Sequence, residues 1–269
     1  MSMPGLRIAA IHNGELDQAP ARSLIGELGD QVSTVTEVTE QAPFAAVPDL
    51  TELSTWRRRQ RELEMNWARY LQRPRSALTS LLGRTVFEAG IRISPARRSD
   101  SWRIRQVEKA VTGKHVRAWR DFLDSTDTEL LVLESDAIRT EVTAEILTNL
   151  LGNPSEQPRY VNLAGGLDPS TLGIERLAGQ PWAVDSQITA YRRPVTNTSC
   201  AYLINRPMAR LAIDHLDRSP GDAQLGIDWL WNTVFLSKQS TPIECLHAQP
   251  PAIIHGSTEG FTKSWHPHR

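Results

Sequence analysis

The chain contains little cysteine and no long apolar run. The first absence argues against a disulfide-stabilised protein, and the second argues against a protein with membrane-spanning helices. Its 269 residues include two cysteines, Cys200 and Cys245, too few for a disulfide framework and not spaced as a metal knuckle. We therefore expect a reducing, cytoplasmic setting. No window approaches the roughly 20 apolar residues that a membrane-spanning helix needs. Any membrane contact is expected to be peripheral, at the inner face of the membrane.

Other absences concern targeting and charge. The segment from Met1 to His12 lacks a basic region followed by a long apolar one, so we do not expect a signal peptide. A formal net charge of -1 argues against a polyanion ligand for the chain as a whole. Basic residues do gather between Trp56 and Arg120, but Glu62 dilutes that stretch, and no nucleic-acid partner is expected.

Strand-like and helix-like segments alternate along the chain, which predicts an α/β fold with a mostly parallel central sheet. We predict one domain over residues 1–269, with an arginine-rich helical insertion at about 51–84 and a flexible tail at about 250–269. The expected strands are 6–12, 32–38, 130–133, 159–163 and 200–204, and the expected helices are 20–28, 53–71, 106–124, 141–151, 206–216 and 223–236.

The most informative segment is 130–137, Leu-Leu-Val-Leu-Glu-Ser-Asp-Ala, an apolar run that ends in two carboxylates. Such a run is typical of a central strand that is buried on both faces. Glu134 and Asp136 then lie at its carboxyl end, the edge where ligands bind in open α/β sheets. Because paired buried carboxylates need a cation, the segment predicts a divalent metal site. The alternative is that both residues only end the strand, with Asp136 accepting a hydrogen bond in a turn.

Two residues elsewhere have chemistry that suits such a site. Asp228 lies in the apolar stretch 225–231, where desolvation raises a carboxyl pKa and favours a general base. His255 lies between apolar residues and Gly256, so its imidazole could complete a metal shell or contact a phosphate. The alternatives are a helix-face aspartate bonded to a neighbour and a surface histidine. Among the tryptophans, Trp182 and Trp265 are the candidates for stacking on a sugar ring.

The order of several short motifs resembles glycosyltransferase family 25, which includes bacterial lipooligosaccharide sugar transferases and collagen galactosyltransferases. The match covers about 106–257. Two positions depart from the family pattern: its Ser-His is Lys114-His115 here, and the middle residue of its Glu-Asp-Asp is Ser135. The motifs that carry the resemblance are Glu108, Lys114-His115, 119–121, 130–137, 160–163, 201–204 and Asp228.

The resemblance implies an A-type glycosyltransferase fold, with a Rossmann-like mixed sheet flanked by helices, a nucleotide-sugar donor such as a UDP-hexose, and a Mn²⁺ or Mg²⁺ ion. Such an ion stabilises the charge of a leaving diphosphate and takes carboxylate and phosphate oxygens as ligands. The implied roles are metal binding by Asp136 and Glu134, donor binding by Glu134, Ser135, His115 and Glu108, and catalysis by Asp228. The residue chemistry described above adds His255 to the expected metal ligands.

The expected function is therefore transfer of a hexose, galactose or glucose, from a nucleotide sugar to a cell-surface glycan or glycolipid acceptor. Ser135 removes one negative charge from the acidic motif, which motivates a second hypothesis. In that hypothesis the chain keeps the fold and binds a nucleotide or a partner without transferring sugar. A third hypothesis is a nucleic-acid-binding protein that uses its arginine-rich helix.

Overall fold

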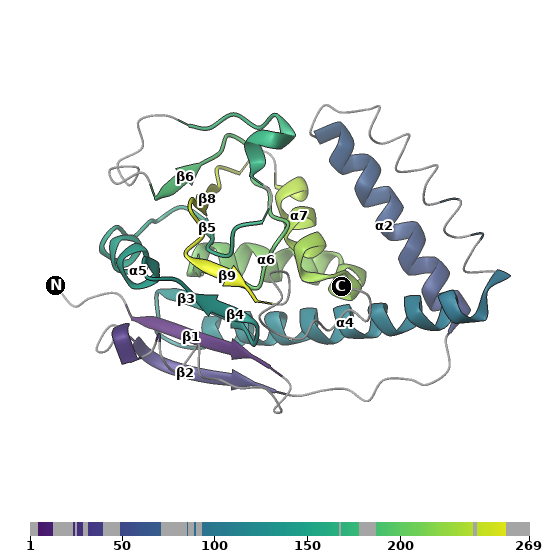
Figure 1. The fold of residues 1–269 in the computed structure, drawn as a ribbon, viewed down its shortest axis with the longest axis horizontal. Helices are drawn as coiled ribbons and strands as arrows, with labels where there is room; N and C mark the ends of the chain where they lie inside the picture. The colour runs from purple at the N-terminus through teal and green to yellow at the C-terminus, as the bar shows by residue number, and fades with distance from the viewer. Residues whose placement is uncertain are drawn as a thin grey trace.

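A seven-stranded mixed sheet lies at the centre of the computed structural model, with helices on both of its faces (Figure 1). The structure describes residues 5–12, 24, 26–28, 32–39, 49–70, 85, 89, 93–166, 168–177, 187–238 and 241–256. The sheet order is β2-β1-β3-β7-β5-β8-β6. Its strands are β1 (Leu6–Ile11), β2 (Val32–Val38), β3 (Glu129–Glu134), β5 (Arg159–Asn162), β6 (Ile188–Ala190), β7 (Ala201–Asn205) and β8 (Glu244–Ala248).

Strand direction decides which side chains meet at each edge of the sheet. β1, β2 and β3 are mutually parallel, and β5 and β8 run in the same direction as they do. β7 and β6 run the opposite way. The predicted α/β class and mixed sheet are thus confirmed, and the antiparallel β7 brings its amino end to the carboxyl end of β3.

The apolar run of β3 is buried on both faces, as predicted. Leu130 and Val132 pack in one core with Trp119 and Trp231, beneath α4 (Pro95–Leu123), α6 (Arg206–Arg218) and α7 (Ile227–Ser237). Leu131 and Leu133 pack on the opposite face against α5 (Thr143–Gly152). Because successive side chains of a strand alternate between faces, only a continuous apolar run can serve both cores.

The helices α4 and α7 differ most from prediction in where they begin. α4 starts at Pro95, well before residue 106, because proline is accommodated in the first turn and the added turns bury Trp102 and Arg105. α7 starts at Ile227 rather than 223, because residues Pro220–Gln224 form a separate 3₁₀ helix, η4. A second 3₁₀ helix, η2 (Pro169–Leu172), lies between β5 and β6.

The helix α2 (Leu50–Tyr70) stands at the amino-terminal end of α4 (Figure 1). It buries Trp56 in a small cluster with Trp102 and Leu225. Its arginine-rich face is partly engaged, because Arg59 donates to Asp222 of η4 through Nε at 3.0 Å and Nη2 at 3.3 Å. Residues 71–84 of the predicted insertion lie outside the described residues.

A two-stranded antiparallel sheet of β4 (Ala137–Arg139) and β9 (Ile253–His255) completes the carboxyl side of β3. β9 falls within the segment expected to be a flexible tail, of which residues 257–269 lie outside the described part. β4, β6, β8 and β9 are strands without a counterpart in the sequence prediction. In the described residues, no helix combines the length and the apolar character needed to cross a membrane.

Candidate functional site

The acidic end of β3 forms the floor of the candidate site. The Glu134 backbone N–H donates to the Cys200 carbonyl at 2.7 Å, which keeps β3 paired with the chain entering β7 up to its last residue. Asp136 follows in the turn before β4, and its side chain is 8% exposed. The pattern of an apolar strand followed by two carboxylates therefore places both at the carboxyl edge of the sheet, as predicted.

The small sheet brings His255 to Asp136 from more than a hundred residues away. Ala137 of β4 pairs with His255 of β9, and the Gly256 N–H donates to the Asp136 carbonyl at 2.7 Å. The His255 Nδ1 atom lies 3.6 Å from Asp136 Oδ2. These backbone bonds hold the imidazole over the carboxylate.

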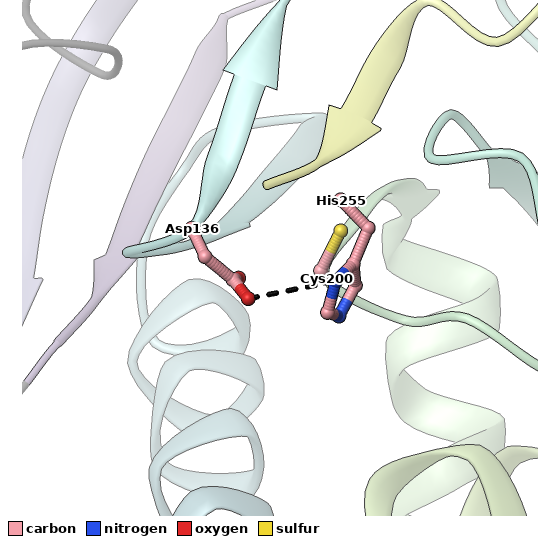
Figure 2. A group of neighbouring side chains, drawn as sticks. All are labelled: Asp136, Cys200 and His255. Atoms are coloured by element: carbon pink, nitrogen blue, oxygen red, sulfur yellow. Dashed lines mark ion pairs between the residues drawn. The ribbon is translucent and has the colours of Figure 1, made fainter. Parts of the chain in front are cut away.

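Cys200 is the third member of a group of ligand-type side chains. One ligand atom each from Asp136, Cys200 and His255 lies within 4.8 Å of the others. Figure 2 shows the Asp136 carboxylate and the His255 ring turned toward each other, with Cys200 beside the ring. The antiparallel β7 causes this meeting, since its register sets Ala201 opposite Leu133 and thus Cys200 beside Glu134.

Glu134 faces a different partner, His115 of α4. His115 Nε2 lies 3.0 Å from Glu134 Oε1, and Nδ1 lies 2.8 Å from the Tyr202 hydroxyl. Trp119 Nε1 also donates to that hydroxyl at 2.8 Å. Because an indole can only donate, all groups are satisfied when Tyr202 donates its proton to Nδ1 and Nε2–H donates to Glu134. Glu134, one of the three predicted metal ligands, is thus turned toward His115, whereas Cys200 lies beside the other two, Asp136 and His255.

Burial decides the charge states of the Glu134 carboxyl group and the His115 imidazole. Burial, together with the neighbouring Asp136, raises the pKa of Glu134 to about 8, although 21% of the side chain is exposed. Burial lowers the pKa of the His115 imidazole to about 3. A neutral His115 at neutral pH agrees with a role as a fixed hydrogen-bond donor to Glu134.

Lys114 supplies positive charge next to the carboxylates. It is buried, and its ammonium group donates to the His12 carbonyl, just after β1, at 2.7 Å. Burial lowers the pKa of Lys114, while the Glu134 carboxylate raises it. The Lys114-His115 pair therefore sends one side chain to the end of β1 and the other to the end of β3.

Asp228 approaches the same edge from the first turn of α7, after Gly226 at the N-cap. Burial raises the pKa of Asp228 to about 6, and Glu134 adds to the increase, while Ser199, His115 and His255 oppose it. Asp228 as a whole residue is half-buried. A carboxylate with this pKa is ionised at neutral pH and can accept a proton.

One buried carboxylate oxygen in this region, Asp136 Oδ1, has no hydrogen-bond partner among the residues that the structure describes. Buried polar atoms are nearly always paired, with protein, water or a ligand. This oxygen therefore marks the region as a place for a polar ligand or an ion.

The structure thus brings together five residues predicted for the site, Glu134, Asp136, Asp228, His115 and His255. The carboxyl group of Glu108 packs near the Cα of Gly226 at the start of α7, two residues before Asp228. Ser135 is half-buried in the turn between the two carboxylates. Trp182 and Trp265 lie outside the described residues.

Sequence reasoning missed Cys200, Ser199 and Tyr202 as members of this region. A strand over 200–204 was expected, but its direction was not. Had the strand been recognised as antiparallel to β3, its first residues would have been placed beside Glu134. No local signal in the sequence reveals that direction.

Comparison with known proteins adds no family assignment. No protein-family model matches the chain, and no curated protein matches it.

Proposed function

We propose that this protein is a glycosyltransferase that moves a hexose from a nucleotide-sugar donor to a glycan or glycolipid acceptor. The observation that carries the proposal is the meeting of Glu134, Asp136 and Asp228 with His115 and His255 at the carboxyl edge of β3. The order of motifs that resembles glycosyltransferase family 25 supports it, because each of these residues except His255 belongs to those motifs.

Asp228 is the proposed catalytic base. Displacement at the anomeric carbon requires removal of a proton from the acceptor hydroxyl, and a half-buried carboxylate with a pKa of about 6 suits that step. His115 holds Glu134 through its Nε2–H, and Tyr202 in turn holds His115. Glu134 is thereby positioned toward the donor.

The resemblance implies a Mn²⁺ or Mg²⁺ ion, and the residues present provide ligands for a divalent cation. Asp136 and His255 would hold it, and the buried Asp136 Oδ1 has no partner in the described part of the chain. When bound, a divalent cation stabilises the negative charge of a departing diphosphate.

The decisive experiment measures sugar transfer from UDP-galactose and UDP-glucose to a panel of glycan acceptors. Asp228→Asn keeps the size of the side chain but removes the base, so transfer should fall by roughly 100-fold or more. The wild-type rate should also decrease as the pH falls below about 6, where Asp228 gains a proton. Asp214→Asn, an exposed change on α6, is the matched control. Full transfer by Asp228→Asn would refute its role as the base.

A binding protein without transfer is the second candidate. Its supporting observation is the pKa of about 8 at Glu134, which together with Ser135 leaves fewer negative charges for a cation at neutral pH. Thermal unfolding with UDP and Mn²⁺ separates the two functions. Binding raises the melting temperature in both cases, but a non-catalytic protein shows this rise with no transfer or donor hydrolysis.

A further inference from the structure

Cys200 changes the kind of metal that the site at Asp136 should prefer. Mg²⁺ takes oxygen ligands in octahedral geometry, and Mn²⁺ is likewise best served by carboxylates, carbonyls and water. Here one carboxylate, one imidazole and one thiol meet within 4.8 Å. A set that contains sulfur and nitrogen is typical of Zn²⁺.

The distances agree with a tetrahedral ion. Zn²⁺ binds nitrogen, oxygen and sulfur at about 2.0–2.3 Å, so two of its ligand atoms lie about 3.5 Å apart. His255 Nδ1 and Asp136 Oδ2 are already 3.6 Å apart. Movement of side chains by about an ångström would bring a set that spans 4.8 Å to this geometry.

A buried cysteine alone would be explained by packing, because free cysteines are among the most buried residues. The carboxylate of Asp136 provides a second, independent observation. This side chain is 8% exposed, and its Oδ1 atom has no hydrogen-bond partner within the described residues. A buried carboxylate oxygen without a donor is stabilised by a cation.

We propose that Asp136, Cys200 and His255 form a three-ligand site that binds Zn²⁺ in preference to Mn²⁺ and Mg²⁺, with the Cys200 thiolate as one ligand. The thiol proton leaves to solvent as the ion binds. The His255 side chain is 25% exposed, which gives the ion a path from solvent and leaves a fourth position for a ligand. Metal binding at these residues does not require that the protein transfer sugar.

The test uses the untagged full chain, stripped of metal with a chelator and without nucleotide. Isothermal titration with Zn²⁺, Mn²⁺ and Mg²⁺ should give the tightest binding for Zn²⁺. Co²⁺ serves as a coloured substitute, and a thiolate-to-cobalt charge-transfer band in the near ultraviolet should appear on binding. Because even residues that only orient a metal ligand change affinity by about 10–100-fold, Cys200→Ser should weaken Zn²⁺ binding roughly tenfold or more and remove the band.

Cys245→Ser is the matched control, since Cys245 is equally buried but contacts the Val195 carbonyl and His247 rather than Asp136. It should keep both the Zn²⁺ affinity and the cobalt band. Tighter binding of Mn²⁺ than of Zn²⁺, or a wild-type cobalt complex without the thiolate band, would overturn the proposal. That last measurement needs no variant and therefore decides the matter even if Cys200→Ser does not fold.

The outcome is independent of the proposed transferase activity. Zinc binding through Cys200 without sugar transfer would support the metal site and count against the transferase. Transfer with Mn²⁺ in a Cys200→Ser protein whose Zn²⁺ affinity is unchanged would support the transferase and overturn the zinc site.

Discussion

The Tyr202 hydroxyl forms hydrogen bonds with two buried groups, the Trp119 indole N–H and the Nδ1 atom of His115. It accepts from the Trp119 indole and donates to His115, whose other nitrogen holds Glu134. All of these atoms except those of Glu134 are fully buried. A single hydroxyl therefore determines the orientation of the imidazole at the candidate site.

Tyr202→Phe should show what this hydroxyl contributes. Loss of the oxygen leaves the Trp119 N–H and His115 Nδ1 buried without their partner, so the free energy of unfolding should fall by about 1–3 kcal/mol. Chemical denaturation measures this change.

Tyr160→Phe is the matched control for that experiment. Its hydroxyl bonds Thr196 Oγ1 at 3.0 Å, and that atom keeps a second bond from Asn162 after the change. The loss should therefore be smaller than for Tyr202→Phe. If Tyr160→Phe lowers the free energy of unfolding as much as Tyr202→Phe or more, the Tyr202 hydrogen bonds to Trp119 and His115 do not have the expected effect on stability.

At the scale of elements, Asp222 of η4 joins three parts of the molecule. It is 2% exposed and accepts hydrogen bonds from Arg59 of α2 and from His215 of α6. Burial alone would raise its pKa, but the bonds from His215 and Arg59 prevail and lower the pKa of Asp222. The Asp222 carboxylate thus links the arginine-rich helix α2 to α6 through hydrogen bonds. Asp222 also lines a cavity of about 330 Å³ between α2 and η4.

Asp222→Asn should loosen α2 without unfolding the sheet. An amide cannot accept from both partners as a carboxylate does, so stability should decrease by about 2 kcal/mol. Amide hydrogen exchange should increase most over Leu50–Tyr70. The exposed Asp214→Asn change on α6 is the control, and equal exchange in α2 for both variants would show that Asp222 does not hold this helix.

At the scale of the whole molecule, stability depends on pH through carboxyl groups that the fold buries. Glu129, at the start of β3 and 2% exposed, is the clearest case outside the candidate site. Burial raises its pKa to about 7, and Glu244 raises it further, while Arg159 opposes both. The folded state therefore holds this proton over a pH range in which the unfolded chain has lost it.

The sign of the pH effect follows from that difference. Between pH 4.5, the ordinary value, and about 7, the folded chain binds more protons, so stability decreases as pH rises through this window. Glu129→Gln removes this contribution, which amounts to about 3 kcal/mol across the window. Denaturation at several pH values measures it. Glu145→Gln, an exposed change on α5, is the control, and a pH dependence unchanged by Glu129→Gln would refute the assignment.

The sequence by itself determined the α/β class, the buried strand β3 and the position of Glu134 and Asp136 at its end. These depend on local patterns: an apolar run must be buried on both faces, and polar residues must end it. Asp228 was also singled out from a local pattern, because burial in an apolar stretch raises the pKa of a carboxyl group.

Only the tertiary structure decided which side chains meet. The antiparallel direction of β7 sets Cys200 beside Glu134, and the pairing of β9 with β4 brings His255 onto Asp136. The turn of Glu134 toward His115 depends likewise on how α4 packs over the sheet. Strand direction and pairing of distant segments arise from the packing of the whole core, and short patterns in the chain do not contain them. The acidic motif and its place in the sheet could therefore be predicted, whereas the thiol of Cys200 beside it could not.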